Sequence, residues 1–337
     1  MSWDKIQGQN RAVSMLQRSL KNKRITHAYL FTGARGTGKR KIAIELAKAL
    51  FCENDSLNPC DQCRNCRRIE NGNHPDVFEV VPEGRSLKIE QMRELQRKSS
   101  YRSTESQRKI YIIHQAEFLT LQAANSLLKF LEEPTSGVVA VLLSENEHAI
   151  LPTIRSRCQI VTFSTPSPKL LAGYLMDEGF HPELARLSAH ITADLDEARQ
   201  LCQSELFARL KNLVIQLSEE ILFRPNQAFF TIQQQFSVND EFKENLQLFL
   251  DIFLLWWRDL IFMKINHAEG PSIFVEQQES IKRQGSKMEI DDGINGMEKI
   301  LEAKKKLSSY ANPQLILEQV VIHLRSDRIV SSSRSPL

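Results

Sequence analysis

The 337-residue sequence has no long uninterrupted run of apolar residues. Its most apolar stretch, Phe249 to Phe262, is interrupted by Asp251, Arg258 and Asp259. It is also shorter than the roughly 20 residues that a membrane-spanning helix needs, so we expect a buried helix there. The N-terminal segment MSWDKIQGQNR lacks the apolar stretch of a secretory signal. We therefore expect a cytoplasmic protein.

Cysteine is scarce outside one short segment. Only Cys158 and Cys202 lie elsewhere, and the other four cysteines fall within fifteen residues: Cys52, Cys60, Cys63 and Cys66. This clustering argues against a disulfide framework and favours a metal site. The composition, 42% hydrophobic and 25% charged, excludes a disordered or collagen-like chain and suffices for more than one packed core.

Acidic residues are also scarce in the first half of the chain. Residues 1–164 contain 25 Lys and Arg against 17 Asp and Glu, whereas residues 165–337 contain 19 against 24. The net charge of +3 therefore combines a basic first half with an acidic second half. A basic surface favours contact with phosphates, although any solvated surface carries charge.

Apolar runs alternate with helical patterns as far as residue 164. Strands are predicted at 28–32, 77–81, 109–113 and 138–143, which makes residues 1–164 an α/β domain with a parallel sheet. The segment STPSP at 164–168 is typical of a linker, and the pattern beyond it is helical. We predict a small helical domain at 165–205, a larger one at 206–330 and a disordered tail at 331–337.

The first predicted strand leads directly into a glycine-rich loop and then a helix. This order and the spacing Gly33-x4-Gly38-Lys39 are typical of a loop that wraps a phosphate. The predicted nucleotide-binding residues are Gly33, Gly36, Thr37, Gly38 and Lys39. A tight glycine turn with an incidental lysine is the alternative.

The groups that hydrolysis needs are missing. Arg40 stands where a Ser or Thr hydroxyl would ligate Mg²⁺, and His114 and Gln115 stand where two carboxylates would hold Mg²⁺ and orient water. Glu117 lies beyond the strand end, where a solvated or capping role is favoured. We interpret this as a nucleotide-binding shape with a defective Mg²⁺ site and without hydrolysis; whether ATP binds stays open.

The four clustered cysteines have the spacing of a structural Zn²⁺ site. Cys52-x7-Cys60-x2-Cys63-x2-Cys66 supplies the four thiolates of a closed tetrahedral site, which leaves no position for a catalytic water. Two alternatives stay open: an iron–sulfur centre, which wants a further cysteine where Glu70 stands, and free or redox-active thiols.

Two arginines, Arg155 and Arg157, follow the fourth predicted strand in the segment LPTIRSRC. Arginines at this place in a nucleotide-binding fold can reach a neighbouring subunit's phosphates, but from these residues alone a surface salt bridge is the favoured role.

Taken together, these motifs resemble the clamp-loader subunits of bacterial DNA polymerase III, which belong to the AAA+ class. The likeness is dense over 1–164 and thin beyond it. Besides the glycine loop and the cysteines, it is carried by Trp3 with Gly8-Gln9, HAYLF at 27–31, QAANSLLKFLEEP at 122–134, LPTIRSRC at 151–158 and WRDL at 257–260.

The resemblance implies an AAA+ domain with a zinc module at 1–164, a lid at 165–205 and an oligomerising collar at 206–330. It implies a five-subunit ring with gamma/tau ATPase subunits and the delta subunit, which places a sliding clamp on primer–template DNA. It also implies that Arg157 reaches a neighbour's ATP as an arginine finger. Candidates for DNA contact are Lys129, Arg93, Arg97 and Lys98.

The missing hydrolytic groups favour the type of subunit in this family that does not hydrolyse ATP. An active ATPase subunit of the family is the alternative, and an independent zinc-containing DNA-binding adaptor is a third possibility.

Overall fold

A computed structural model describes residues 3, 6–54, 57–84, 86–100, 108–134, 136–238, 240–265, 273–307 and 312–332. The chain forms two compact units, Met1–Ser167 and Pro168–Leu337. Their boundary lies within the predicted linker at 164–168.

The first unit is built on a five-stranded parallel sheet with the order β2-β3-β4-β1-β5. Its strands are β1 (Ala28–Thr32), β2 (Val77–Val80), β3 (Lys109–Ile113), β4 (Val138–Ser144) and β5 (Gln159–Thr162). All four predicted strands are present, with ends that differ by at most one residue. The fifth, at one edge of the sheet, was not predicted.

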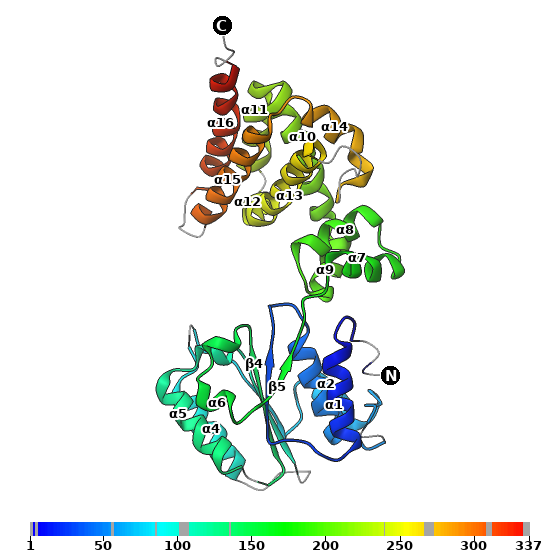
Figure 1. Ribbon diagram of the computed structural model, residues 1–337, viewed down its shortest axis with the longest axis vertical. Helices are drawn as coiled ribbons and strands as arrows, with labels where there is room; N and C mark the ends of the chain where they lie inside the picture. The colour runs from blue at the N-terminus through cyan, green and yellow to red at the C-terminus, as the bar shows by residue number, and fades with distance from the viewer. Residues whose placement is uncertain are drawn as a thin grey trace. The chain divides into compact units, whose positions relative to one another are not determined.

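Helices cover both faces of this sheet (Figure 1). They are α1 (Asn10–Lys21), α2 (Lys39–Phe51), α3 (Arg64–Glu70), α4 (Ile89–Ser100), α5 (Leu121–Glu132) and α6 (Pro152–Arg155), with short 3₁₀ turns η2 (Ala116–Phe118) and η3 (Glu147–Ala149). Alternate side chains of β1 face opposite ways: Tyr29 and Phe31 pack with α1 and α2, whereas Ala28 and Leu30 pack with α4 and α5. The predicted α/β architecture with a parallel sheet is confirmed.

The second unit is helical, with no strand among its described residues. Its first helices, α7 (Pro168–Asp177), α8 (Pro182–Ile191) and α9 (Leu195–Gln203), share a small apolar core of their own. A larger core joins α10 (Glu205–Phe223), α11 (Pro225–Val238), α12 (Asp240–Glu244), α13 (Leu246–Ile265), the turn η4 (Val275–Gln277), α14 (Gln278–Gly285), α15 (Ile290–Leu307) and α16 (Pro313–Ser332).

The division of this unit into a lid at 165–205 and a collar at 206–330 stays a prediction. Of the predicted tail at 331–337, the first two residues end α16, and the rest lies outside the described residues.

The most apolar stretch of the sequence forms α13, which the other helices bury as predicted. Trp256 and Trp257 are almost fully buried, and α15 approaches α13 closely at Gly296. A Cβ atom on Gly296 would lie 2.4 Å from Nε1 of Trp257, so no larger residue fits without movement. None of the described helices is long and apolar enough to cross a membrane.

Candidate functional site

The glycine-rich loop joins the end of β1 to the start of α2 and requires glycine at three positions. Gly36 and Gly38 have φ angles of +79° and +80°, in the left-handed region that other residues avoid. At Gly33 the constraint is space, because a Cβ atom would lie 2.4 Å from the carbonyl oxygen of Phe163. The Gly33 N–H donates to the Ser144 carbonyl at 3.2 Å, which fixes the loop to β4.

The lysine of this loop folds back onto it. Nζ of Lys39 donates to the carbonyl oxygens of Gly33 at 2.5 Å and Ala34 at 2.7 Å. Burial lowers the pKa of Lys39, against the opposing charges of Glu145 and Glu117. Thr37 is buried and donates its hydroxyl proton to Ala34 O at 2.8 Å. The five predicted residues thus form one loop at the N-terminus of α2, as a phosphate-binding loop requires.

Two residues that replace the expected magnesium ligands meet at one carboxylate. Arg40 makes a bidentate hydrogen bond to Glu79 on β2, with Nε donating to Oε2 at 2.9 Å and Nη2 to Oε1 at 2.8 Å. Nε2 of His114, just beyond β3, lies 2.7 Å from the same Oε2 and donates to it. Two of the three departures from the ATPase pattern are therefore joined through Glu79, a residue that the sequence pattern did not single out.

The charges of this cluster stabilise each other. The hydrogen bond from His114 and the pairing with Arg40 lower the pKa of Glu79 to about 2, although partial burial opposes the shift. In turn the hydrogen bond to Glu79 raises the pKa of Arg40. The carboxylate is thus balanced by the guanidinium of Arg40.

The other two residues near the missing acids are arranged differently. Gln115 is exposed and has a left-handed backbone, with φ of 48°. Glu117 is half-buried rather than solvated: its Oε1 accepts the Glu145 N–H at 3.1 Å. Of the solvated and capping roles expected from the sequence, the structure thus supports the capping role, in the loop that follows β4.

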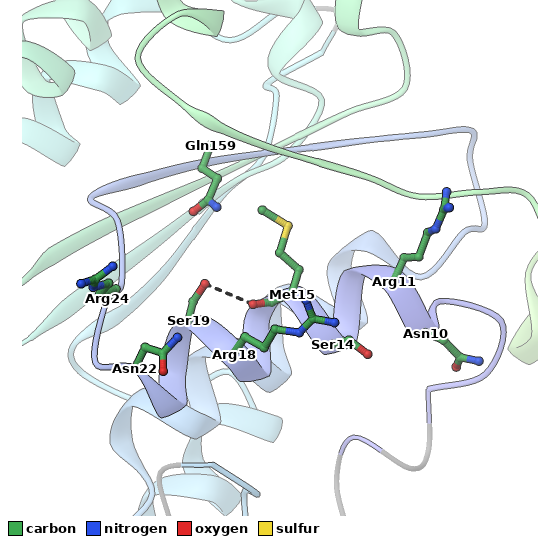
Figure 2. A pocket seen from close by; sticks show the side chains of 9 residues that line it. All are labelled: Asn10, Arg11, Ser14, Met15, Arg18, Ser19, Asn22, Arg24 and Gln159. Atoms are coloured by element: carbon green, nitrogen blue, oxygen red, sulfur yellow. Dashed lines mark hydrogen bonds between the residues drawn. The ribbon is translucent and has the colours of Figure 1, made fainter.

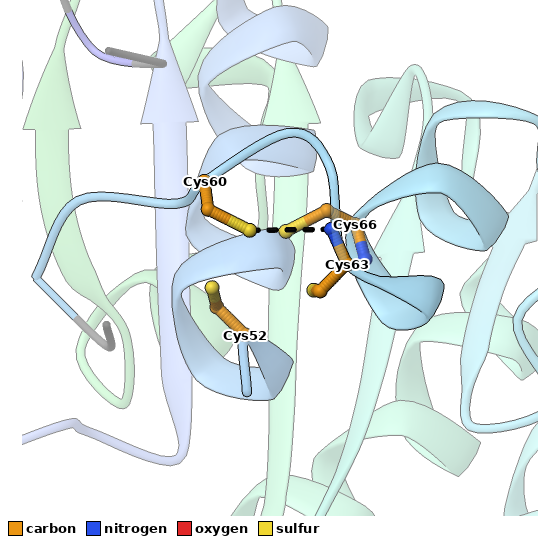
Figure 3. A group of neighbouring side chains, drawn as sticks. All are labelled: Cys52, Cys60, Cys63 and Cys66. Carbon is orange, nitrogen blue, oxygen red and sulfur yellow. Dashed lines mark hydrogen bonds between the residues drawn. The ribbon is translucent and has the colours of Figure 1, made fainter. Parts of the chain in front are cut away.

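The four predicted cysteines come together in one cluster (Figure 3). Cys52 ends α2, Cys60 lies in the following loop, Cys63 caps α3 and Cys66 lies in its first turn. Their Sγ atoms all lie within 4.8 Å of one another. Tetrahedral Zn²⁺ with Zn–S bonds of about 2.3 Å needs sulfurs roughly 3.8 Å apart, so the four residues fit a metal with small side-chain adjustments.

Backbone groups favour thiolates at this cluster. The Cys63 N–H donates to Sγ of Cys60 at 3.3 Å, and the Cys66 N–H donates to Sγ of Cys63 at 3.4 Å. The N–H groups of Gln62 and Cys63 lower the pKa of Cys60 to about 6. Burial raises the pKa of the Cys66 thiol, so a bound cation is needed to hold all four sulfurs as thiolates.

His74 is not part of this cluster. It is buried, its ring is tilted against that of Phe51 with the two centroids 4.7 Å apart, and its Nδ1 accepts the Asp76 N–H at 3.2 Å. It belongs to the turn before β2.

A buried lysine of α2, Lys48, forms ion pairs that connect this helix to the loop between Cys60 and Cys63. The sequence pattern did not single it out. Lys48 pairs with Glu45 at 2.9 Å, with Asp61 in the loop at 3.0 Å and with Glu70 at the end of α3. Burial disfavours the charged form of Lys48, but the hydrogen bonds that its ammonium group donates to Glu70 and Glu45 outweigh burial and raise the pKa of Lys48. The ammonium group of Lys48 therefore links α2 to the loop that carries Cys60 and to α3, which carries Cys66.

Arg157 lies in the turn after α6 with its side chain 37% exposed. Its Nη2 pairs with Glu132 at the end of α5 at 2.9 Å, and its Nη1 donates to the Thr153 carbonyl at 2.9 Å. Arg155 is equally exposed and lies 3.8 Å from Glu147. Within one chain, Arg157 thus makes the surface salt bridge considered above, and its role toward a neighbour stays a prediction.

Known proteins resemble this chain over its whole length. A family model described as DNA polymerase III, delta subunit, matches residues 8–167. The chain is 40% identical over 326 residues to DNA polymerase III subunit delta′ of Bacillus subtilis (strain 168), covering 96% of this chain and 99% of that protein.

Other similarities cover less of the chain or are more distant. The chain is 35% identical over 172 residues to subunit tau of the same organism, covering 51% of this chain and 30% of tau. A solved gamma subunit-related protein of Thermotoga maritima aligns over 93% of this chain and 98% of that one, with 20% identity and a TM-score of 0.48.

Proposed function

This chain belongs to the family of DNA polymerase III delta′ subunits, and on that basis we propose that it is the non-hydrolysing structural subunit of the clamp loader. In this role it offers Arg157 to the ATP site of a neighbouring ATPase subunit. Its own glycine loop is retained as a structural element.

The observation that carries the proposal is the pairing of Arg40 and His114 with Glu79. In an ATPase of this fold, a hydroxyl and a carboxylate at the positions of Arg40 and His114 hold Mg²⁺. Here an arginine balances the nearby acid, and an arginine cannot coordinate a cation. This supports loss of hydrolysis within the chain and leaves catalysis to be supplied in trans.

Arg157 is suited to that task because its present partner is replaceable. The pair with Glu132 is partly exposed on both sides, and such surface pairs contribute about 0–1 kcal/mol. A neighbour's triphosphate, with more charge and more acceptor oxygens, competes with one carboxylate at little cost. The guanidinium then stabilises charge that develops on the transferred phosphoryl group.

We assign the four-cysteine cluster to a structural Zn²⁺ ion held by Cys52, Cys60, Cys63 and Cys66. A bound Zn²⁺ neutralises thiolates and ties the loop to α3; no catalytic step is needed from it. Metal analysis of the purified chain should give about one equivalent of zinc. Cys63→Ser should lose it, whereas Cys202→Ser, outside the cluster, should keep it.

The proposed partners are those of the family: gamma/tau ATPase subunits and the delta subunit in a five-subunit ring, a sliding clamp, and primer–template DNA. In this proposal α7–α9 act as the lid and α10–α16 as the collar through which the ring assembles. The apolar core that α7, α8 and α9 share supports a distinct lid, while Leu187 of α8 joins this lid to the larger core of α10–α16.

The test is ATP hydrolysis by the purified chain with Mg²⁺, with and without primed DNA. We expect no turnover above that of a Lys39→Ala variant. DNA-stimulated turnover that Lys39→Ala abolishes would instead establish the alternative, an active ATPase subunit, and would overturn the proposal.

A further inference from the structure

The outer surface of α1 and the turn after it carry an unbalanced positive charge. Residues 6–44 contain nine Lys and Arg and no Asp or Glu. Five of the nine are exposed on α1 and the following turn: Arg11, Arg18, Lys21, Lys23 and Arg24. Like charges this close repel one another, which favours a surface that receives an anion.

Three of these residues, Arg11, Arg18 and Arg24, have no acidic partner among the described residues. Arg40, Lys48 and Arg157 are each paired with a carboxylate. Among the residues that the structure describes, no ion pair or side-chain hydrogen bond is made by Arg11, Arg18 or Arg24. Their donor groups are therefore available to a ligand.

The same arginines line a groove between α1 and the edge strand β5 (Figure 2). Its volume is roughly 630 Å³, and its lining consists of Asn10, Arg11, Ser14, Met15, Arg18, Ser19, Asn22, Arg24 and Gln159. Figure 2 shows Arg11 and Arg24 toward opposite ends of the groove. Gln159 lies across the groove from α1, and the side chain of Met15 extends from α1 toward it. Met15 is the single apolar side chain in this lining.

We propose that this α1 groove binds the sugar–phosphate backbone of a DNA strand. Arginine, serine, asparagine and glutamine are the side chains that contact phosphates in protein–DNA interfaces, and eight of the nine lining residues are of these types. A docked acidic peptide would normally need apolar anchor pockets, which Met15 alone does not provide. Arg11 and Arg18 are seven residues apart, about 10 Å along the helix, which spans roughly three phosphates of one strand.

This surface is distinct from the residues named above as sequence candidates for DNA contact. The helices that carry Arg93, Arg97 and Lys129, α4 and α5, pack on one face of the sheet, whereas α1 packs on the other. The side chain of Lys98, the remaining candidate, lies outside the described residues. The α1 groove therefore goes beyond the proposed function, since it adds a second DNA-binding surface that does not depend on Arg157.

The test is fluorescence anisotropy of the full chain with a labelled oligothymidylate of about 20 nucleotides, measured over a salt series. The variant is Arg11→Ala/Arg18→Ala/Arg24→Ala, and the control removes equal charge from exposed lysines of the second unit: Lys282→Ala/Lys305→Ala/Lys306→Ala. We expect the groove variant to lose about tenfold or more in affinity and its log–log salt slope to fall by about 2, with the control within about twofold of wild type.

Three results would overturn the proposal: no measurable binding by the wild-type chain, an equal loss in both triple variants, or competition by polyglutamate as strong as by unlabelled DNA. The last would identify an acidic polypeptide as the occupant. Should the groove variant fail to fold, photo-crosslinking of a 4-thiothymidine oligonucleotide to wild-type chain replaces it, and crosslinks that avoid α1 refute the groove. Without DNA, ATP turnover of the reconstituted loader should be the same with the groove variant as with wild type, so this proposal and the Arg157 role fail separately.

Discussion

Replacing Glu79 by Gln tests whether Arg40 and His114 depend on one carboxylate. The substitution keeps the size of the side chain but removes its charge, so Arg40 loses its bidentate partner and His114 loses a charged acceptor. We expect the first unit to become less stable at neutral pH, because the partly buried His114 keeps only a weaker neutral hydrogen bond.

The pKa of Glu79 sets the size of this effect. Folding lowers this pKa from 4.5 to about 2. The shift corresponds to a contribution of about 3 kcal/mol at most to the free energy of unfolding. Because Arg40 is 63% exposed, solvent screening reduces the expected loss to about 1–2 kcal/mol. The pKa is depressed in the folded state, so this stability is present above about pH 4.5 and is lost as the pH falls toward 2.

The assay is urea unfolding of wild type, Glu79→Gln and the control Glu83→Gln between pH 7 and pH 3. Glu83 is exposed on the same segment, and among the described residues it has no ionic partner. We expect the difference between wild type and Glu79→Gln to be constant from pH 7 to 5 and to shrink below that. A difference that does not change with pH, or one that Glu83→Gln reproduces, would refute the reasoning.

Two further predictions concern the packing of the same unit. Lys48→Met removes the buried ammonium group that pairs with three carboxylates and should lower the free energy of unfolding by about 3 kcal/mol. Lys21→Met, on the surface, should change it by less than about 0.5 kcal/mol in denaturant melts. Gly33→Ala should destabilise more than Gly38→Ala, because a Cβ at Gly33 meets the Phe163 backbone at 2.4 Å while one at Gly38 meets no atom within 4 Å. Gly38→Ala should cost only the left-handed backbone, about 1 kcal/mol, and equal melting temperatures for the two variants would contradict this.

The parts of the site that are local in sequence were predictable. The glycine spacing and the cysteine spacing each bring residues together within one loop or one turn, and both clusters form as expected. Three of the four predicted strands, β1, β3 and β4, lie inside the sheet and are apolar runs that are buried at every residue. In contrast, β5 has four residues, begins and ends with polar side chains, and buries only Val161 well. A strand at the edge of a sheet needs few buried residues, so the apolar pattern of β5 was too weak to predict a strand.

The parts that depend on pairing between distant segments were not predictable in the same way. Glu79 meets His114 because β2 and β3 pair in parallel with Val80 opposite Ile113, a register that no local pattern encodes. A signal was nevertheless present, since Glu79 is an acidic residue inside an otherwise apolar strand. Likewise Lys48 and Glu45 lie one turn apart on the buried side of α2, where charged residues need a partner.

The central claim is that this chain supplies catalysis to a neighbour through Arg157. The most direct measurement is ATP turnover by the clamp loader reconstituted with Arg157→Ala, beside Arg155→Ala, an arginine of equal exposure two residues away. We predict intact ring assembly with both variants and, with Arg157→Ala alone, a loss of turnover at the adjoining site of about 10³-fold. Turnover that is unchanged with Arg157→Ala, or reduced as much with Arg155→Ala, would contradict the account.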